Sequence, residues 1–340
     1  MSARSWVLCS IIVGLLCAAS GSVYGQTDES SEIPSLSANP PNSRTALPPR
    51  VIVVTGAGGT EEYAKQHDEW ADSWYQLAEK NAWPLVKLTR SLGDKQKARL
   101  EETLAESSEH PTWLVLIGHG TAAGSDAKFN LVGEDVSSSE LSRWLRDERE
   151  SKVVVACFSA SGAFLPALSR SGCIVVSATQ SGSERNYSRF GKFVAQSLGD
   201  EAADLDHDRE VSLLEAFLFA ANKTGQFYAD SSRLASEHAI IDDNQDGKGT
   251  GSEFFIGARP AGVAKGKNAI DGSTAGKLKL AALPGAIELS EAQQARRREL
   301  ERRVELLRQL KRDLPLKDYY NQLETVMLDI AALYAEAEKQ

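Results

Sequence analysis

The sequence has few cysteines and methionines and no excess of basic residues. Of its 340 residues, four are Cys and two are Met, and Lys and Arg number 38 against 47 Asp and Glu. So few cysteines exclude a small scaffold held together by disulfides. A formal net charge of −9 argues against nucleic acid as the main partner, because phosphate binding needs clustered positive charge.

Long apolar stretches are also scarce, and the one that stands out lies at the N-terminus. Arg4 precedes an apolar core over residues 6–19, and small residues follow with cleavage expected after Ser20 or Gly25. This core is shorter than the roughly 20 residues that a spanning helix needs. We therefore predict a signal peptide at residues 1–25, with an uncleaved anchor as the alternative. The mature protein is then exported to a periplasmic, extracellular or cell-surface location, without an integral membrane span.

The rest of the chain divides by composition into four parts. Residues 26–49 are rich in Ser and Pro and predict a disordered linker. Over 50–258, short apolar runs alternate with helical spacing, which predicts an α/β domain with a mainly parallel sheet flanked by helices. Residues 259–286 are rich in Gly, Ala and Lys and predict a second linker or an extended wrap. Two apolar stripes in 287–340, divided at Leu314–Pro315, predict a helical hairpin or coiled coil that could dock a protein partner.

Residues capable of chemistry follow two of the predicted strands. The apolar run at 113–117 leads into Gly118-His119-Gly120, and the run at 152–156 leads into Cys157-Phe158-Ser159. Uninterrupted apolar runs are typical of buried parallel strands. The carboxyl ends of such strands line the reactive crevice of an open α/β sheet. If the two strands are neighbours, we expect an imidazole and a nucleophile to converge there.

The chemistry of these side chains suggests acyl transfer without a cofactor. An imidazole makes the thiolate of a nearby Cys157 accessible, whereas the hydroxyl of Ser159 is far less acidic and needs stronger activation by His119. The amide of Gly120 could donate to an oxyanion. The candidate catalytic set is therefore His119, Cys157 or Ser159, and Gly120.

These motifs resemble the legumain-like branch of the caspase-type cysteine peptidases, as a divergent, bacterial-type member. That family places a His-Gly pair after one strand and a Cys, shortly followed by Ser-Gly, after the next. Here the pairs are His119-Gly120 and Ser161-Gly162, and the resemblance covers roughly residues 50–228. It implies a caspase-like fold and hydrolysis of a peptide or protein substrate by a His-Cys dyad.

The spacing of the nucleophile departs from the family. The family's nucleophile stands two residues before Ser-Gly, which selects Ser159, whereas the local Ala-Cys pair favours Cys157. Two hypotheses remain open. In the first, the chain is an active endopeptidase. In the second, Cys157 is an inert buried thiol and the chain is a catalytically degenerate, calcium-stabilised binding module.

A glycine-rich turn, Gly56-Ala57-Gly58-Gly59, follows the first predicted strand. It lacks the third glycine of G-x-G-x-x-G, so a nucleotide-binding enzyme is the weakest of three hypotheses.

Two acidic loops have the spacing of twelve-residue calcium loops, in which alternate side chains turn their oxygens toward one cation. Arg209 replaces the usual glycine of the first loop, and Gly249 replaces the usual apolar residue of the second. The alternative is two solvated acidic turns. The candidate ligands of a structural Ca²⁺ are Asp204, Asp206, Asp208 and Glu215 in the first loop, and Asp242, Asn244, Asp246 and Glu253 in the second.

Overall fold

The computed structural model describes residues 47–123, 126–146, 151–261 and 270–339. The predicted signal peptide and nearly all of the first predicted linker lie outside these residues. The chain divides into two compact units, and the larger one spans residues 45–286. The smaller unit contains the C-terminal segment from Ile287.

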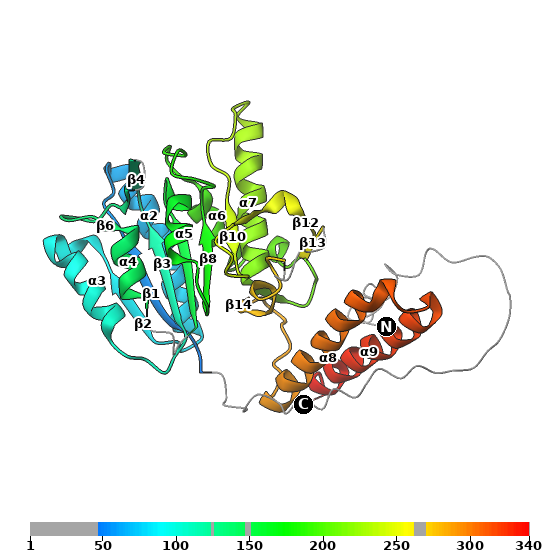
Figure 1. The fold of residues 1–340 in the computed structure, drawn as a ribbon. Coiled ribbons are helices and arrows are strands. Elements are labelled where there is room, and N and C mark those ends of the chain that lie inside the picture. The colour runs from blue at the N-terminus through cyan, green and yellow to red at the C-terminus, as the bar shows by residue number, and fades with distance from the viewer. Residues whose placement is uncertain (1–46, 124–125, 147–150, 262–269, 340) are drawn as a thin grey trace. The chain divides into compact units, whose positions relative to one another are not determined.

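A seven-stranded sheet forms the centre of the larger unit, with the strand order β11-β10-β8-β7-β3-β1-β2 (Figure 1). The five strands from β8 to β2 are parallel to one another. Strand β10 is antiparallel to both of its neighbours, β8 and β11. The predicted α/β fold with a mainly parallel sheet is confirmed. The strands are β1 (Arg50–Thr55), β2 (Leu85–Leu88), β3 (Thr112–Ile117), β7 (Lys152–Cys157), β8 (Cys173–Ser177), β10 (Ile240–Asp242) and β11 (Thr250–Gly251).

The register of the sheet positions the candidate site. Strands β3 and β7 are direct neighbours, and Ile117 pairs with Cys157 at their carboxyl ends. The residues that follow these two strands therefore start from the same edge of the sheet, as expected for parallel neighbours.

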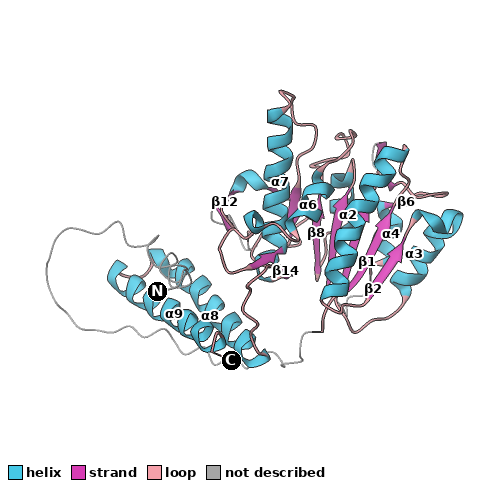
Figure 2. Ribbon diagram, turned by 180° about the vertical axis from the view of Figure 1, so that it is seen from behind, coloured by secondary structure: helices cyan, strands magenta, loops and turns pink. Residues whose placement is uncertain are grey.

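Helices cover both faces of the sheet (Figures 1 and 2). Alternate residues of a strand point to opposite faces, so Val51 and Val53 belong to one core cluster and Ile52 and Val54 to another. This two-sided burial explains the uninterrupted apolar strands. The first face packs against α2 (Glu61–Lys80), α6 (Phe190–Ser197) and α7 (Leu213–Asp230), and the second against α3 (Gln96–Ala105), α4 (Ser138–Trp144) and α5 (Leu165–Leu168).

Side-chain caps fix where several helices begin. The hydroxyl of Thr60 accepts from the amide of Tyr63 at the start of α2. Ser137 and Glu140 form a capping box at α4, as their spacing in the sequence predicts. Ser212 and Glu215 form another at α7. Short 3₁₀ segments are η1 (Arg90–Lys95), η2 (Ser161–Phe164), η3 (Glu201–Ala203), η4 (Ser252–Phe254), η5 (Ala275–Lys277) and η6 (Leu310–Arg312).

Several short strands had no counterpart in the predictions. A three-stranded antiparallel sheet follows His119 and consists of β4 (Gly120–Ala123), β5 (Asp126–Phe129) and β6 (Val136–Ser137). Two further pairs are β9 (Glu210–Ser212) with β14 (Lys279–Ala282), and β12 (Phe255–Ile256) with β13 (Arg259–Pro260).

Of the two predictions for 259–286, the described part from residue 270 onward agrees with the extended wrap and not with a free linker. Leu280 and Ala275 are fully buried, Asp271 is 2% exposed, and β14 pairs with β9. The segment therefore belongs to the larger unit. Its single short apolar run, Leu278–Leu283, is too brief to show periodicity, yet it contributes to the core of the domain.

The C-terminal unit is the predicted helical hairpin. Helix α8 (Glu291–Gln309) and helix α9 (Leu316–Ala337) pack on each other, and Pro315 is the N-cap of α9. In the part of the chain that the structure describes, no helix combines the length and the apolar character needed to cross a membrane. The core of the hairpin consists of Leu300, Val304, Leu307, Tyr319, Leu323, Val326 and Leu333.

Candidate functional site

His119 lies two residues beyond β3 and is half-buried. Its Nε2 atom is 3.1 Å from the carbonyl oxygen of Gly58, in the turn that follows β1. Since a carbonyl only accepts hydrogen bonds, Nε2 carries a proton in this contact. Neutral His119 therefore has its lone pair on Nδ1, which is the atom available as a base.

Aromatic rings surround His119. The ring centroids of Tyr63, His67 and Tyr187 lie 5.6, 5.2 and 5.7 Å from that of His119. Tyr63 and Tyr187 stack with their centroids 4.1 Å apart, and the Tyr187 hydroxyl donates to Gln66 Oε1 at 2.7 Å. Two of these rings belong to α2, so the imidazole packs on the helix that follows the glycine-rich turn.

His67 is fully buried beside His119. Neither of its ring nitrogens has a hydrogen-bond partner among the described residues. Burial, followed by the nearby His119 and Arg90, lowers the pKa of His67 to about 3. His67 is therefore neutral at physiological pH and acts as part of the packing around His119.

Ser159 connects the two strand ends through hydrogen bonds. Its hydroxyl accepts from the amide of Gly120 at 3.2 Å and donates to the carbonyl of Gly120 at 3.1 Å. The residue is only 2% exposed. The next residue, Ala160, has a left-handed backbone with φ of 59°, and its amide donates to the carbonyl of Glu184 at 2.7 Å. The structure thus places Ser159 against the backbone of the His119-Gly120 pair.

Cys157 is enclosed within the core. It is the last residue of β7, is 1% exposed, and has a free thiol. Gly191 of α6 packs closely against Cys157 and Trp70. A Cβ atom added at Gly191 would lie only 2.7 Å from the Cβ of Cys157 and 2.9 Å from the ring of Trp70. Burial raises the pKa of the Cys157 thiol, and the carboxylate of Glu237 raises it further. The thiol is therefore protonated and buried away from solvent. The ring of His119 packs against Tyr63, His67 and Tyr187 instead.

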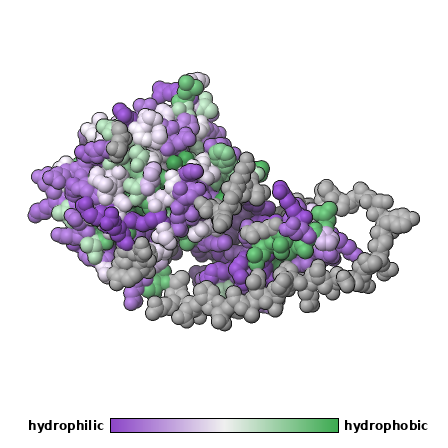
Figure 3. All heavy atoms as spheres, viewed as in Figure 1, coloured by the Kyte–Doolittle hydropathy of each residue, from purple (hydrophilic) through white to green (hydrophobic). Residues whose placement is uncertain are grey.

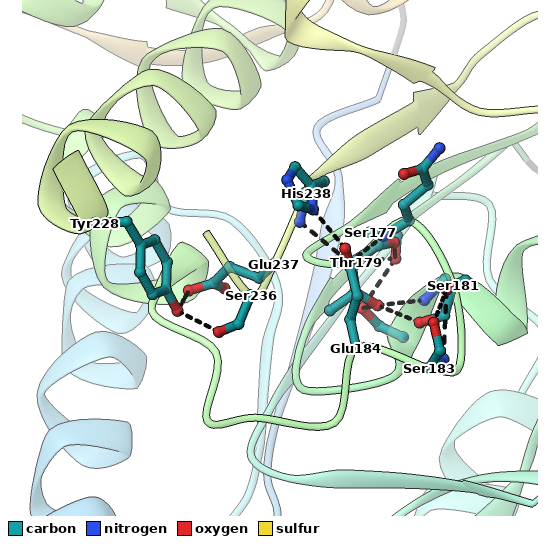
Figure 4. Close-up of polar contacts among 12 residues, drawn as sticks. Ser177, Thr179, Ser181, Ser183, Glu184, Tyr228, Ser236, Glu237 and His238 are labelled. Atoms are coloured by element: carbon teal, nitrogen blue, oxygen red, sulfur yellow. Dashed lines mark hydrogen bonds and ion pairs between the residues drawn. The ribbon is translucent and has the colours of Figure 1, made fainter. Parts of the chain in front are cut away.

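A buried carboxylate, Glu237, is the main polar feature that the sequence did not reveal. It accepts hydrogen bonds from the Ser188 hydroxyl at 2.6 Å and from the amide of Arg189 at 2.9 Å. It also accepts one from the Tyr228 hydroxyl at 3.1 Å (Figure 4). These contacts tie the start of α6 to the end of α7. Glu237 is far from all of these partners in sequence except Tyr228, so no local pattern indicated this role.

A second buried network anchors the Ser-Gly pair of the motif. The Ser177 hydroxyl donates to the Ser161 hydroxyl at 2.9 Å, and the amide of Gly162 donates to the Thr179 hydroxyl at 2.9 Å. Ser177 and Thr179 lie at the end of β8 (Figure 4). All four groups are inside the protein, so this network fixes the turn after Ser159.

The first acidic loop brings three carboxylates together. Oxygen atoms of Asp204, Asp206 and Asp208 lie within 4.8 Å of one another, so this triad could hold a metal ion. Arg209 adopts the left-handed conformation, with φ of 67°, and its amide donates to Asp204 Oδ2 at 3.0 Å. Glu215 lies beneath the loop, where its carboxylate accepts from the amide of Leu205 at 2.8 Å and caps α7.

In the second acidic loop, as in the first, the carboxylate at the first position accepts from the amide five residues later. Asp242 is fully buried and accepts from the amides of Gln245 at 2.8 Å and Gly247 at 3.1 Å. The side chain of Asn244 accepts from the amide of Asp246 at 2.9 Å. Glu253 is exposed and belongs to η4.

The two loops do not pair with each other. Strand β9, which follows the first loop, pairs with β14, while β10 and β11, which flank the second, pair with each other and β8. Among the described residues, the first loop is the one that gathers three carboxylates close enough to hold a metal ion, so it is the candidate metal site.

Comparison with known proteins gives no family for this chain: no family profile matches the sequence, and no curated protein matches it either.

Proposed function

We propose that the protein is an exported, non-hydrolysing module with a caspase-like fold that binds a peptide segment beside His119. The bonding of Ser159 is the observation that carries this proposal. The hydroxyl accepts from the N–H of Gly120 and donates to its C=O, so it holds the turn after β7 against the start of β4. A serine nucleophile would instead need its hydroxyl directed to an activating base.

The state of Cys157 supports the same conclusion. A thiol reacts as the thiolate, which requires a lowered pKa and access to the substrate. Burial and the Glu237 carboxylate raise the pKa of Cys157 instead, and the residue is only 1% exposed. Both nucleophiles that the sequence offered thus have structural roles.

The ligand class that fits the region beside His119 best is an extended peptide. Strand β4 begins immediately after His119 and is an edge strand of its small sheet. Its first residue, Gly120, is already bonded to Ser159, so a peptide would pair with β4 beyond Gly120. Edge strands can add a peptide through backbone hydrogen bonds. Tyr63 and Tyr187 supply aromatic surface next to the imidazole. These features offer contacts for side chains of a bound peptide.

The test is a comparison of hydrolysis and binding by the mature protein with a mixed peptide library. We expect mass spectrometry to recover bound peptides intact from wild type. In Ser159→Cys, a thiol stands at the position that the family spacing selects. We expect this variant also to leave the peptides intact, because the side chain at position 159 is 2% exposed and faces the backbone of Gly120. Hydrolysis by wild type that requires His119 would contradict the proposal.

An exported endopeptidase is the second candidate function, and the backbone at Ala160 favours it. A non-glycine residue in the left-handed region costs energy, and such strain clusters at active sites. In this alternative His119 is the general base and Ser159 or Cys157 attacks the scissile carbonyl. Loss of wild-type hydrolysis in Ser159→Ala or in Cys157→Ala would identify the nucleophile.

We also propose that the triad of Asp204, Asp206 and Asp208 binds a structural Ca²⁺ ion. Hard divalent cations prefer several carboxylate and carbonyl oxygens at close range. A ligand that binds only the folded state stabilises it by about 2.7 kcal/mol at 100 times its Kd. We expect Ca²⁺ to raise the Tm of wild type and to have a smaller effect in Asp206→Asn. Asp246→Asn is the matched control in the second loop.

A further inference from the structure

Arg189, directly before α6, carries a positive charge without a counter-ion among the described residues. Its guanidinium carbon lies 4.4 Å from the ring centroid of Phe227 and 5.4 Å from that of Tyr187. Within the described part of the chain, the guanidinium makes these ring contacts but no hydrogen bond or ion pair. The residue is half-buried, and its nitrogens are not among the buried polar atoms that lack a partner, so they are open to solvent.

Two carboxylates belong to the segments that pack around Arg189, and both have other partners. Glu237 accepts from the Ser188 hydroxyl at 2.6 Å and from the amide of Arg189 at 2.9 Å, so it holds the backbone of Arg189 and not its side chain. Glu184 accepts from the amide of His238 at 3.1 Å and also bonds to the ring of His238 (Figure 4). Partial burial of a charge without a counter-ion costs free energy. The guanidinium therefore offers an anionic ligand a contact that the protein itself leaves unused.

The guanidinium is positioned before any ligand binds. Its backbone is fixed by Glu237, and its plane packs on two aromatic rings. A guanidinium packed in this way presents N–H groups at its edge, where they match the two oxygens of a carboxylate. Phosphate groups are more often bound by clusters of arginines. Hydrophilic and apolar residues are interspersed on the visible face of the larger unit (Figure 3), so the charge of Arg189 is a clearer guide to a ligand than an apolar patch.

Tyr187 connects Arg189 to the region beside His119. One face or edge of the Tyr187 ring contacts the guanidinium, and its centroid lies 5.7 Å from that of His119. Tyr187 also stacks on Tyr63 of α2, which fixes the position of its ring. An extended peptide advances roughly 3.3 Å per residue, so about three residues reach from His119 to Arg189.

From these contacts we infer that Arg189 determines the specificity of the proposed peptide site by binding a carboxylate of the peptide. The carboxylate belongs to an Asp or Glu side chain or to the C-terminus of the peptide, since both present the same planar pair of oxygens. This inference rests on the proposed peptide-binding function and adds the chemical class of the ligand to it.

The test measures the binding of three pools of short fluorescent peptides to the full mature chain by fluorescence polarisation. The first pool has Glu at one fixed position and an amidated C-terminus. The second has Gln at that position and an amidated C-terminus, and the third differs from the second in its free C-terminal carboxylate. We expect wild type to bind the first or the third pool about tenfold more tightly than the second, or better, because the second lacks the charge-assisted hydrogen bonds. The pool that is preferred identifies the source of the carboxylate.

Variants of Arg189 separate loss of the contact from loss of folding. Arg189→Gln should abolish the preference and leave the Kd for the second pool unchanged, which also shows that the variant is folded. Arg189→Lys keeps the charge without the planar fork, so we expect a weakened preference. Arg185→Gln is the matched control, because Arg185 is an exposed arginine of the same loop and donates to the carbonyl of Gly182. It should keep the preference in full.

The outcomes distinguish this inference from the function on which it rests. Equal affinities of wild type for all three pools would overturn the inference and leave the peptide-binding proposal standing. A preference that both Arg189→Gln and Arg189→Lys keep in full would do the same. Failure of wild type to bind any pool would instead overturn the proposed function, and the inference with it.

Discussion

The Ser159 hydroxyl makes two hydrogen bonds with Gly120, one from the amide at 3.2 Å and one to the carbonyl at 3.1 Å. This pair of bonds joins the turn after β7 to the first residue of β4, next to His119. Where an active site would leave a nucleophile free, this protein uses the hydroxyl to hold two loops together.

Ser159→Ala should destabilise the protein. The substitution removes the side-chain partner of two buried backbone groups, and buried polar groups without partners cost about 1–3 kcal/mol. We expect the free energy of unfolding, measured by urea denaturation, to fall by about that amount. Ser183→Ala, at an exposed position in a nearby loop, is the control and should have little effect. An unchanged stability in Ser159→Ala would show that the hydroxyl does not hold the loops.

Cys157 should resist alkylation in the native protein. Its thiol lies beneath Trp70 and α6, and burial raises its pKa. Reaction with iodoacetamide, followed by peptide mass spectrometry, should therefore be at least roughly 100-fold slower than at an exposed cysteine introduced by Ser183→Cys, since opening of core elements costs several kcal/mol. Rapid labelling of Cys157 at neutral pH would indicate an accessible thiolate and would favour the endopeptidase alternative.

His67→Phe should make the protein more tolerant of acid. The pKa of His67 is lowered to about 3 in the folded state from an ordinary 6.5. Protonation therefore favours the unfolded state, and stability is lost as pH falls below 6.5, by about 1.4 kcal/mol per unit until the folded pKa is reached. Phe does not titrate. We expect the difference in unfolding free energy between the variant and wild type, measured by urea denaturation, to shift by about 2 kcal/mol in favour of the variant between pH 7.5 and pH 5. A difference that stays constant with pH would contradict this.

Asp271→Asn should change the pH dependence in the opposite direction. Burial raises the pKa of Asp271 to about 6 from an ordinary 3.8, although the Thr250 hydroxyl and two amides donate to it. The charged form is costly in the folded state above pH 6, and this cost is relieved as pH falls toward 3.8. Between pH 7 and pH 4 we expect wild type to gain roughly 2–3 kcal/mol relative to the variant. A constant difference between the two unfolding free energies would show that Asp271 does not titrate in this range.

Much of the fold was predictable because its signals are local and repeated. The apolar runs of β1, β3, β7 and β8 are buried on both faces, which is the condition that removes polar alternation from a strand. The apolar stripes of α8 and α9 predicted the hairpin because a helix that buries one face carries a regular, local pattern. The sequence left the adjacency of β3 and β7 as a condition, and their pairing agrees with the preference for adjacent connections in parallel sheets.

The state of the candidate site was not predictable because it depends on residues distant in sequence. Whether Cys157 is exposed depends on Trp70 and Gly191, which come from two different helices. The bonds of Ser159 depend on how the turn at Gly120 meets the end of β7. Strand β14 was missed because its apolar run lies among Gly, Ala and Lys residues, where composition alone predicts a linker.

The most direct test of a site without a working nucleophile is the yield of cleaved peptide from a mixed library incubated with wild type and with His119→Ala. Any mechanism through Cys157 or Ser159 would use His119 as its base, so this one comparison covers both. The degenerate-site proposal predicts the same product yield for both proteins, equal to that of the buffer blank. Cleavage by wild type that is absent from His119→Ala would contradict it.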